Sequence, residues 1–138
     1  MAEEWRIEFY ETSDGGRPVE RWIARLAPAE RRAFKAAVSE LLIPLGPGVC
    51  STPWGSHLGA GLFELRIARG AELPEGGSSG RRAAQARLLL RVFCHAHGGR
   101  LILLLGGYDK LRRPKRNEQQ RQIALARRRL ADFRRRKA

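Results

Sequence analysis

A tyrosine and a series of cations follow the most apolar run of the chain. Residues 101–105 are all apolar, and they lead through a pair of glycines to Tyr108 and Lys110. The next six residues contain four more cations: Arg112, Arg113, Lys115 and Arg116. Side chains of these types bind phosphate groups, and a site built from them can stabilise the charge that develops on a phosphate during its transfer. Arginine, lysine and tyrosine can do this without a metal ion.

Other arginines lie on two segments that alternate in polarity as strands do. Arg66 ends the polar face of "GLFELR", and Arg87 and Arg91 share one face of "QARLLLRVFCHAH". If these segments pair in one sheet, their arginines converge with the end of the apolar run. We therefore predict a catalytic site made of four residues: Arg66, Arg87, Tyr108 and Lys110. Five more residues are predicted to bind RNA: Arg91, Arg112, Arg113, Lys115 and Arg116.

Several roles in this site stay open. Arg66 could instead form a salt bridge with Glu64. Tyr108, expected to stack on or position a base, could instead be a core aromatic at a strand end. The general base is unassigned; Glu64 and His95 are candidates on chemical grounds only, because both can accept a proton near neutral pH when neighbours tune the pKa. His95 and His97 share a strand face but have no acidic or cysteine partner at ligand spacing, so we predict no metal site and no cofactor.

The composition indicates one small globular domain. The chain has 138 residues, 43% of them hydrophobic, which is enough for a single core over residues 1–138. No apolar run approaches the roughly 20 residues of a membrane span. The first residues, "MAEEWRIEFYE", lack the apolar core of a signal peptide, so a cytoplasmic location is expected. Cys50 and Cys94 are then expected to be reduced thiols.

The positive charge is concentrated near the C-terminus. The formal net charge is +13; residues 1–109 carry 14 basic and 12 acidic groups, whereas residues 110–138 carry 13 and 2. This asymmetry favours a polyanionic partner, either nucleic acid or an acidic protein. The basic segment at 117–136 could grip rRNA phosphates, could be covered by an acidic partner segment that folds on binding, or could be a solvated helix face.

Hydrophobic periodicity predicts an α+β fold in the order β-α-α-β-β-β-α. Strands are expected near 4–11, 61–69, 85–97 and 100–108, with Gly98-Gly99 as a two-residue hairpin between the last two. Helices are expected from Pro18, from Pro28 and from an N-cap at Asn117. The stretch 70–84 is rich in Gly and Ser and reads as a long flexible loop. We expect a small antiparallel or mixed sheet with the helices packed on one face.

Five ordered segments resemble the phage-type HigB branch of the RelE/ParE toxin superfamily. These are "WRIEFYE…DGGRPVERWIARL", "GLFELRIAR", "RLLLRVF", "RLILLLGGYDK" and the closing basic helix. The resemblance implies a type II toxin: a metal-independent endoribonuclease that cuts mRNA in the ribosome and is neutralised by a helix-turn-helix antitoxin. Some relatives poison DNA gyrase instead, and a third implied outcome is an inactive nucleic-acid-binding relative.

The chain departs from the family pattern after its last strand. The family has an aromatic residue, any residue and then two lysines; here Leu111 takes the second lysine's place, and Arg112 or Arg113 is the expected substitute. Two lysines of the RelE branch correspond to Leu62 and Glu64, so that part of the RelE site does not carry over.

Overall fold

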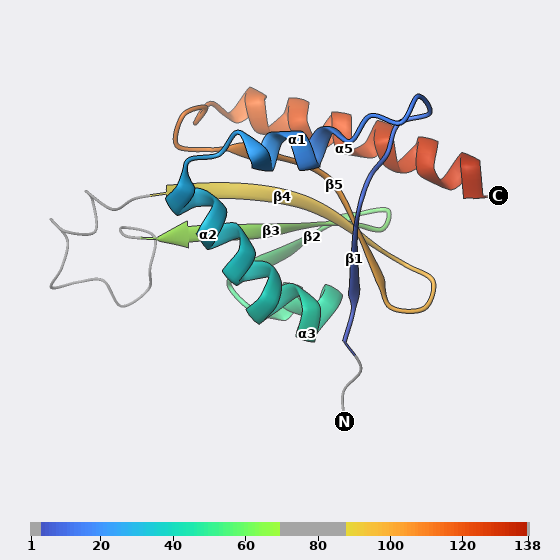
Figure 1. The fold of residues 1–138 in the computed structure, drawn as a ribbon, viewed down its shortest axis with the longest axis horizontal. Helices are drawn as coiled ribbons and strands as arrows, with labels where there is room; N and C mark the ends of the chain where they lie inside the picture. Colours follow the sequence, from blue (N-terminus) through green and yellow to red (C-terminus); the bar gives the residue numbers. More distant parts are fainter. Residues whose placement is uncertain (1–3, 70–87, 138) are drawn as a thin grey trace, which may run out of the picture.

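Five strands form one mixed sheet with helices on both faces (Figure 1). The structure is a computed structural model that describes residues 4–69 and 88–137. The predicted loop at 70–84 and the predicted site residue Arg87 lie outside the described residues. The strand order is β1-β5-β4-β3-β2. The strands are β1 (Arg6–Phe9), β2 (Gly55–Gly59), β3 (Leu62–Arg69), β4 (Leu88–His97) and β5 (Leu101–Asp109).

The pairing of the strands leaves part of β5 at an edge of the sheet. β2, β3, β4 and β5 pair antiparallel in succession, whereas β1 runs parallel to β5. The β1 ladder ends at Leu104 of β5, and the β4 ladder shifts register beside Cys94, so that Leu105 bulges. From Leu105 to Asp109, β5 therefore has a strand neighbour on one side only.

One face of the sheet is covered by the helices that follow β1. These are α1 (Pro18–Ala24), α2 (Pro28–Ala37), a π-helical turn η1 (Val38–Leu42), α3 (Ile43–Leu45) and a 3₁₀ segment η2 (Gly46–Ser51). Their apolar residues pack against the side chains of β3 and β4 that the alternation assigned to one face. Alternate residues of the two strands share this face because side chains of a strand point to opposite sides in turn. They are Phe63, Leu65 and Ile67 of β3 and Leu88, Leu90, Val92 and Cys94 of β4, and all lie in this core.

The other face is covered by the long basic helix α5 (Arg116–Lys137), as Figure 1 shows. Ala126, Leu130 and Phe133 of α5 are buried against a second apolar cluster that includes Phe93 and Leu105. The expectation that all helices pack on one face was therefore wrong. The five apolar residues of β5 required this arrangement, because alternate side chains of that strand need an apolar cover on each face.

Most predicted elements are present, with local differences. The α+β class, the order and the antiparallel hairpin between β4 and β5 are confirmed. The strand β2 was missed, because "GSHLG" has no apolar alternation. The hairpin has three linking residues rather than two, with Gly98 and Arg100 both at positive φ. The last helix begins at Arg116, one residue before the predicted cap, and Leu45 is exposed rather than in the core.

One helical stretch of the described residues, Pro28–Ser51, is long and apolar enough to cross a membrane by length and composition alone. In this fold the stretch comprises α2, η1, α3 and η2, and it packs on the sheet through Phe34, Leu42 and Val49. Helices that pack in the core of a globular protein can be as long and apolar as a membrane-spanning helix, so this test alone is weak evidence. The stretch therefore belongs to the core of a small globular protein. Cys50 and Cys94 are both free thiols, as expected.

Candidate functional site

Three of the predicted site residues form a row across the sheet beneath the start of α5. Arg66 of β3 is opposite Arg91 of β4, and Arg91 is opposite Tyr108 of β5. Residues in register on adjacent strands project from the same face, which here is the face covered by α5. The sequence-based expectation that these strands bring the three residues together is confirmed.

The carboxylate of Glu64 lies at the centre of this row. Its side chain is only 4% exposed, and its Oε2 atom lies 3.2 Å from Nε of Arg66 and 3.9 Å from Nε of Arg91. Gln119 of α5 donates a hydrogen bond of 3.4 Å to Oε1. A buried carboxylate is tolerated only with such partners. Glu64 therefore holds the two arginines in place and links the sheet to α5.

Arg66 is engaged by protein atoms at all three of its nitrogens. Besides the ion pair with Glu64, Nη1 donates to the carbonyl of Pro53 at 2.7 Å and Nη2 donates to Oγ of Ser56. The guanidinium thus fastens β3 to β2 and to the segment before it. This is the salt-bridge arrangement that the sequence left open, with the cation held inside the fold.

Tyr108 occupies a core position. The residue is 4% exposed, and its ring stacks on Phe93 with centroids 6.3 Å apart. Burial raises the pKa of Tyr108, so the phenol stays protonated at neutral pH. Its hydroxyl has no hydrogen-bond partner among residues 4–69 and 88–137. The ring face is covered and does not stack on a ligand in this conformation.

The turn after β5 presents the accessible cations. Asp109 shapes this turn: its Oδ1 accepts the N–H groups of Leu111 at 3.0 Å and Arg112 at 3.3 Å, and its Oδ2 lies 3.4 Å from Nε of Arg112. Lys110 is partly exposed, and four further cations are exposed: Arg112, Arg113, Lys115 and Arg116. A short turn with an Asp at its start therefore gathers five of the predicted site cations in one place.

Glu118 in the first turn of α5 opposes part of this charge. Its carboxylate lies 3.6 Å from Arg113 and 3.3 Å from Arg121, and it accepts a hydrogen bond of 2.8 Å from Gln122. The Gln122 hydrogen bond, reinforced by the two arginines, lowers the pKa of Glu118. The carboxylate also stabilises the positive end of the helix. It orients Arg113 beside the start of α5.

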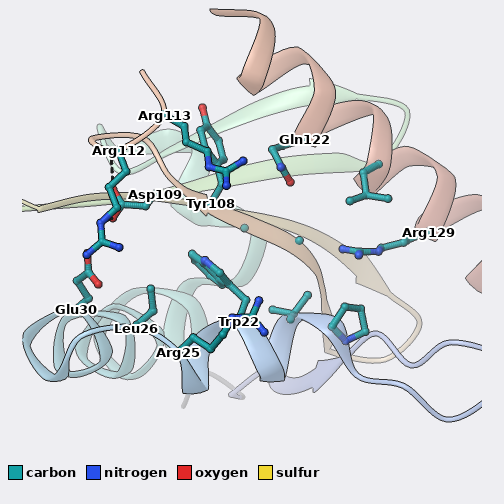
Figure 2. A pocket seen from close by; sticks show the side chains of 15 residues that line it. Trp22, Arg25, Leu26, Glu30, Tyr108, Asp109, Arg112, Arg113, Gln122 and Arg129 are labelled. Carbon is teal, nitrogen blue, oxygen red and sulfur yellow. Dashed lines mark hydrogen bonds and ion pairs between the residues drawn. The ribbon is translucent and has the colours of Figure 1, made fainter. Parts of the chain in front are cut away.

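A cleft of about 450 Å³ opens between α1 and α5, along the part of β5 that pairs with β4 but no longer with β1. In Figure 2, Trp22 and Arg25 extend from the α1 side, Gln122 and Arg129 lie on the α5 side, and Tyr108 lies between. The lining includes four arginines and two acidic residues: Arg25, Arg112, Arg113, Arg129, Glu30 and Asp109. The cleft is therefore cationic and joins the exposed turn after β5.

The floor of the cleft depends on two glycines with different surroundings. A Cβ at Gly107 would overlap the Cζ3 atom of Trp22 and lie 2.7 Å from Cη2, whereas a Cβ at Gly106 would lie 3.5 Å from Nη1 of Arg129. Gly107→Ala is expected to destabilise the fold by about 1–3 kcal/mol through overpacking. Gly106→Ala is expected to be neutral or stabilising by up to about 1 kcal/mol, because alanine suits a strand better than glycine.

Urea unfolding of the two variants beside the wild type measures this difference. Because the glycines are adjacent and the substitution is the same, Gly106→Ala is the matched control. Equal unfolding midpoints for the two variants would contradict the placement of Trp22 against Gly107.

His95, the other candidate base, lies farther along β4 and is closed to solvent. Its Nδ1–H donates to the carbonyl of Gly61 at 2.8 Å, and its ring meets the edge of Phe133. Burial lowers the pKa of His95, and the nearby Arg134 and His97 act in the same direction. His95 therefore remains neutral in the folded protein at neutral pH. Among the described residues, no three His, Cys, Asp or Glu side chains gather as metal ligands would.

The lowered pKa of His95 predicts a loss of stability in acid. The unfolded chain binds this proton more readily than the fold does, so the free energy of unfolding should fall as the pH drops below about 6.5, the ordinary histidine pKa. His95→Gln should reduce this decline between pH 7.5 and 5, measured by urea unfolding. His57→Gln, at an exposed position, is the control and should leave the decline unchanged. An unchanged decline in His95→Gln would contradict the assignment.

Three residues of the cleft were not selected as site residues from the sequence. Trp22 fitted the apolar stripe of the first helix, Arg129 fitted the solvated cations of the last helix, and Arg25 follows α1. Trp22 is only half-buried, which helical periodicity does not distinguish from a core position. No local signal brings α1 near α5, because that proximity depends on how the sheet is assembled.

Neither a scan against protein-family models nor a search of the curated proteins found a match to this chain. The resemblance to the RelE/ParE toxins is therefore carried by the five ordered segments of the sequence alone.

Proposed function

We propose that this protein is the toxin of a type II toxin-antitoxin pair and acts as a metal-independent, ribosome-dependent mRNA endoribonuclease. The observation that carries the proposal is the group of exposed cations after β5, which adjoins a cationic cleft at the open end of the sheet. The five ordered segments support the family and imply a helix-turn-helix antitoxin as partner. The ribosome and mRNA would then be met in the cytoplasm.

The proposed chemistry follows from which side chains are accessible. Lys110 and Arg113 project near the end of β5, where they would contact the scissile phosphate and stabilise the charge that develops on it. Attack by the 2′-hydroxyl on phosphorus would break the bond to the 5′-oxygen, which takes up a proton, and leave a 2′,3′-cyclic phosphate. Glu64 is held by arginines and His95 by Gly61. Water is therefore assigned as the acceptor of the 2′-hydroxyl proton.

A second function is favoured because the row of Arg66, Arg91 and Tyr108 is largely inaccessible to a ligand. Arg91 and Tyr108 are buried, and Arg66 is engaged by three protein groups. Such a row stabilises a fold without contributing to chemistry. The alternative is therefore a non-enzymatic module of the same fold, either a gyrase poison or an inactive nucleic-acid-binding relative, with the cationic surface as its binding face.

Controlled expression of the wild-type protein in a bacterial host tests the proposal. Growth, mRNA 5′ ends and the supercoiling of a reporter plasmid would be followed together. Growth arrest with new 5′ ends inside translated messages is the expected result. Arrest with intact messages and altered supercoiling would replace the nuclease with a gyrase poison, and normal growth with intact messages would favour the inactive relative.

A further inference from the structure

Arg129 is a half-buried cation on the wall of the α1–α5 cleft. Its Nη1 donates to the carbonyl of Leu105 at 2.8 Å, and its guanidinium lies over the ring of Tyr10 at 5.9 Å. No carboxylate among residues 4–69 and 88–137 lies within ion-pairing distance of it. Burial lowers the pKa of Arg129, which reflects the cost of keeping this charge away from water. An anion in the cleft would offset that cost.

A second cation without an ion pair faces the same cleft from the opposite wall. Arg25, the residue after α1, also has no carboxylate partner in the described part of the chain. The acidic residues that line the cleft are occupied elsewhere: Glu30 accepts the N–H of Ala27 at 3.0 Å, and Asp109 caps the turn after β5. Two arginines from separate helices are thus available to one anionic ligand.

Apolar side chains form another part of the lining. Trp22 is half-buried with its ring edge against Gly107, and Leu26 and Leu125 line the cleft nearby. In Figure 2, Trp22 and Arg25 extend from the same side of the hollow, and Arg129 lies across from them. An indole beside arginines is a platform for a nucleobase whose phosphate the cations hold. The volume of about 450 Å³ lies within the range of about 300–1,000 Å³ that is typical of ligand sites.

We propose that the α1–α5 cleft binds one nucleotide of single-stranded RNA, with the base against Trp22 and its phosphate between Arg25 and Arg129. The inference rests on the proposed function and adds a substrate-binding subsite on the α1 side of Tyr108. The cleft would hold the nucleotide next to the scissile phosphate. The RNA strand would then be fixed in position while the cations of the turn after β5 contact that phosphate. Binding at this subsite requires no cleavage.

Binding of a short 2′-fluoro RNA oligonucleotide, which lacks the attacking hydroxyl, tests the cations of the cleft. The charge-removing double variant Arg25→Gln/Arg129→Gln is compared with Arg21→Gln/Arg128→Gln, which removes exposed arginines from the same two helices. The cleft variant should bind more weakly, and its dependence of log Kd on log salt should be less steep by about 0.7 for each phosphate that the variant no longer binds. The control should stay near the wild type. Equal affinity for the two double variants would overturn the subsite.

An abasic oligonucleotide tests the role of Trp22. Removing the stacked base should weaken wild-type binding by about 5- to 100-fold, and Trp22→Leu should weaken binding of the intact oligonucleotide to a similar extent. The two effects should not add, since each removes the same stacking interaction. This cycle remains informative if the variant is less stable, because both oligonucleotides are compared on one protein. Additive effects, or no effect of the missing base, would show that the cleft does not stack a base.

These results separate the subsite from the proposed nuclease. If messages stay uncut in cells and the cleft variant binds the oligonucleotide more weakly than the wild type, the nuclease proposal is wrong and the subsite is supported. If messages are cut and the cleft variants bind RNA as the wild type does, the nuclease proposal is supported and the subsite is wrong. Failure of the wild type to bind the oligonucleotide would also overturn it.

Discussion

The Lys110→Ala variant is expected to cut ribosome-bound mRNA about 10²- to 10³-fold more slowly than the wild type, the usual cost of removing one charged donor from a preorganised site. Lys110 follows β5 directly, and its backbone N–H is fixed to the carbonyl of Leu89 at 2.9 Å. No carboxylate of the described residues pairs with its ammonium, so the charge is available to a phosphate. Single-turnover cleavage on programmed ribosomes would measure this effect.

The matched control for this variant is Lys35→Ala on α2. Lys35 carries the same charge, is exposed rather than partly exposed, and does not belong to the turn after β5. Both variants should have the circular dichroism spectrum and unfolding midpoint of the wild type. Normal cleavage by Lys110→Ala would exclude this lysine from the chemistry and leave the arginines of the turn as candidates. An equal reduction in the two variants would indicate a general effect of charge.

Replacement of Glu64 by alanine is expected to lower the free energy of unfolding by about 3–5 kcal/mol, because it removes a buried carboxylate that pairs with both Arg66 and Arg91. The side chain of Arg91 is 9% exposed and its Nε lies 3.9 Å from this carboxylate, whereas that of Arg66 is 31% exposed and can regain some water. The lower end of the range is therefore expected. Gln119 would also lose its acceptor, which weakens the attachment of α5 to the sheet. Urea unfolding followed by circular dichroism measures the change.

Glu40→Ala is the control for Glu64→Ala, since Glu40 is exposed on η1. It should change the free energy of unfolding by less than about 0.5 kcal/mol, as surface substitutions usually do. Glu64→Gln should fall between the two, because the amide keeps an acceptor but removes the charge. A decrease of under about 1 kcal/mol in Glu64→Ala would show that the row of Arg66, Arg91 and Tyr108 does not depend on the carboxylate.

Side-chain alternation was enough to predict much of this row. The period of two in β3 placed Glu64 and Arg66 on one face, and the same period in β4 placed Arg91 on the corresponding face. The hairpin glycines then set β4 against β5 and so brought Arg91 opposite Tyr108. What alternation does not give is burial. The row is closed because α5 lies over it, and α5 was expected on the other face.

The cleft was beyond sequence-based prediction for a related reason. It exists because β1 ends at Phe9, four residues along β5, and because α1 and α5 then flank the part of β5 that has only β4 as a strand neighbour. None of these relations is local in sequence. The half-buried position of Trp22 follows from them, as does the position of Arg129, which has no ion pair within residues 4–69 and 88–137. In isolated helices, Trp22 would belong to an apolar stripe and Arg129 would be a solvated cation.

The sequence by itself determined the α+β class, the faces of β3 and β4, the β4–β5 hairpin and the concentration of charge after β5. These features follow from local rules: periodicity, turn chemistry and composition. The tertiary structure decided which cations are buried and which are accessible. It placed β1 parallel to β5 and α5 on the second face of the sheet, because the apolar β5 needs cover on both faces. That packing enclosed Arg91 and Tyr108 and left Lys110, Arg113 and the α1–α5 cleft open.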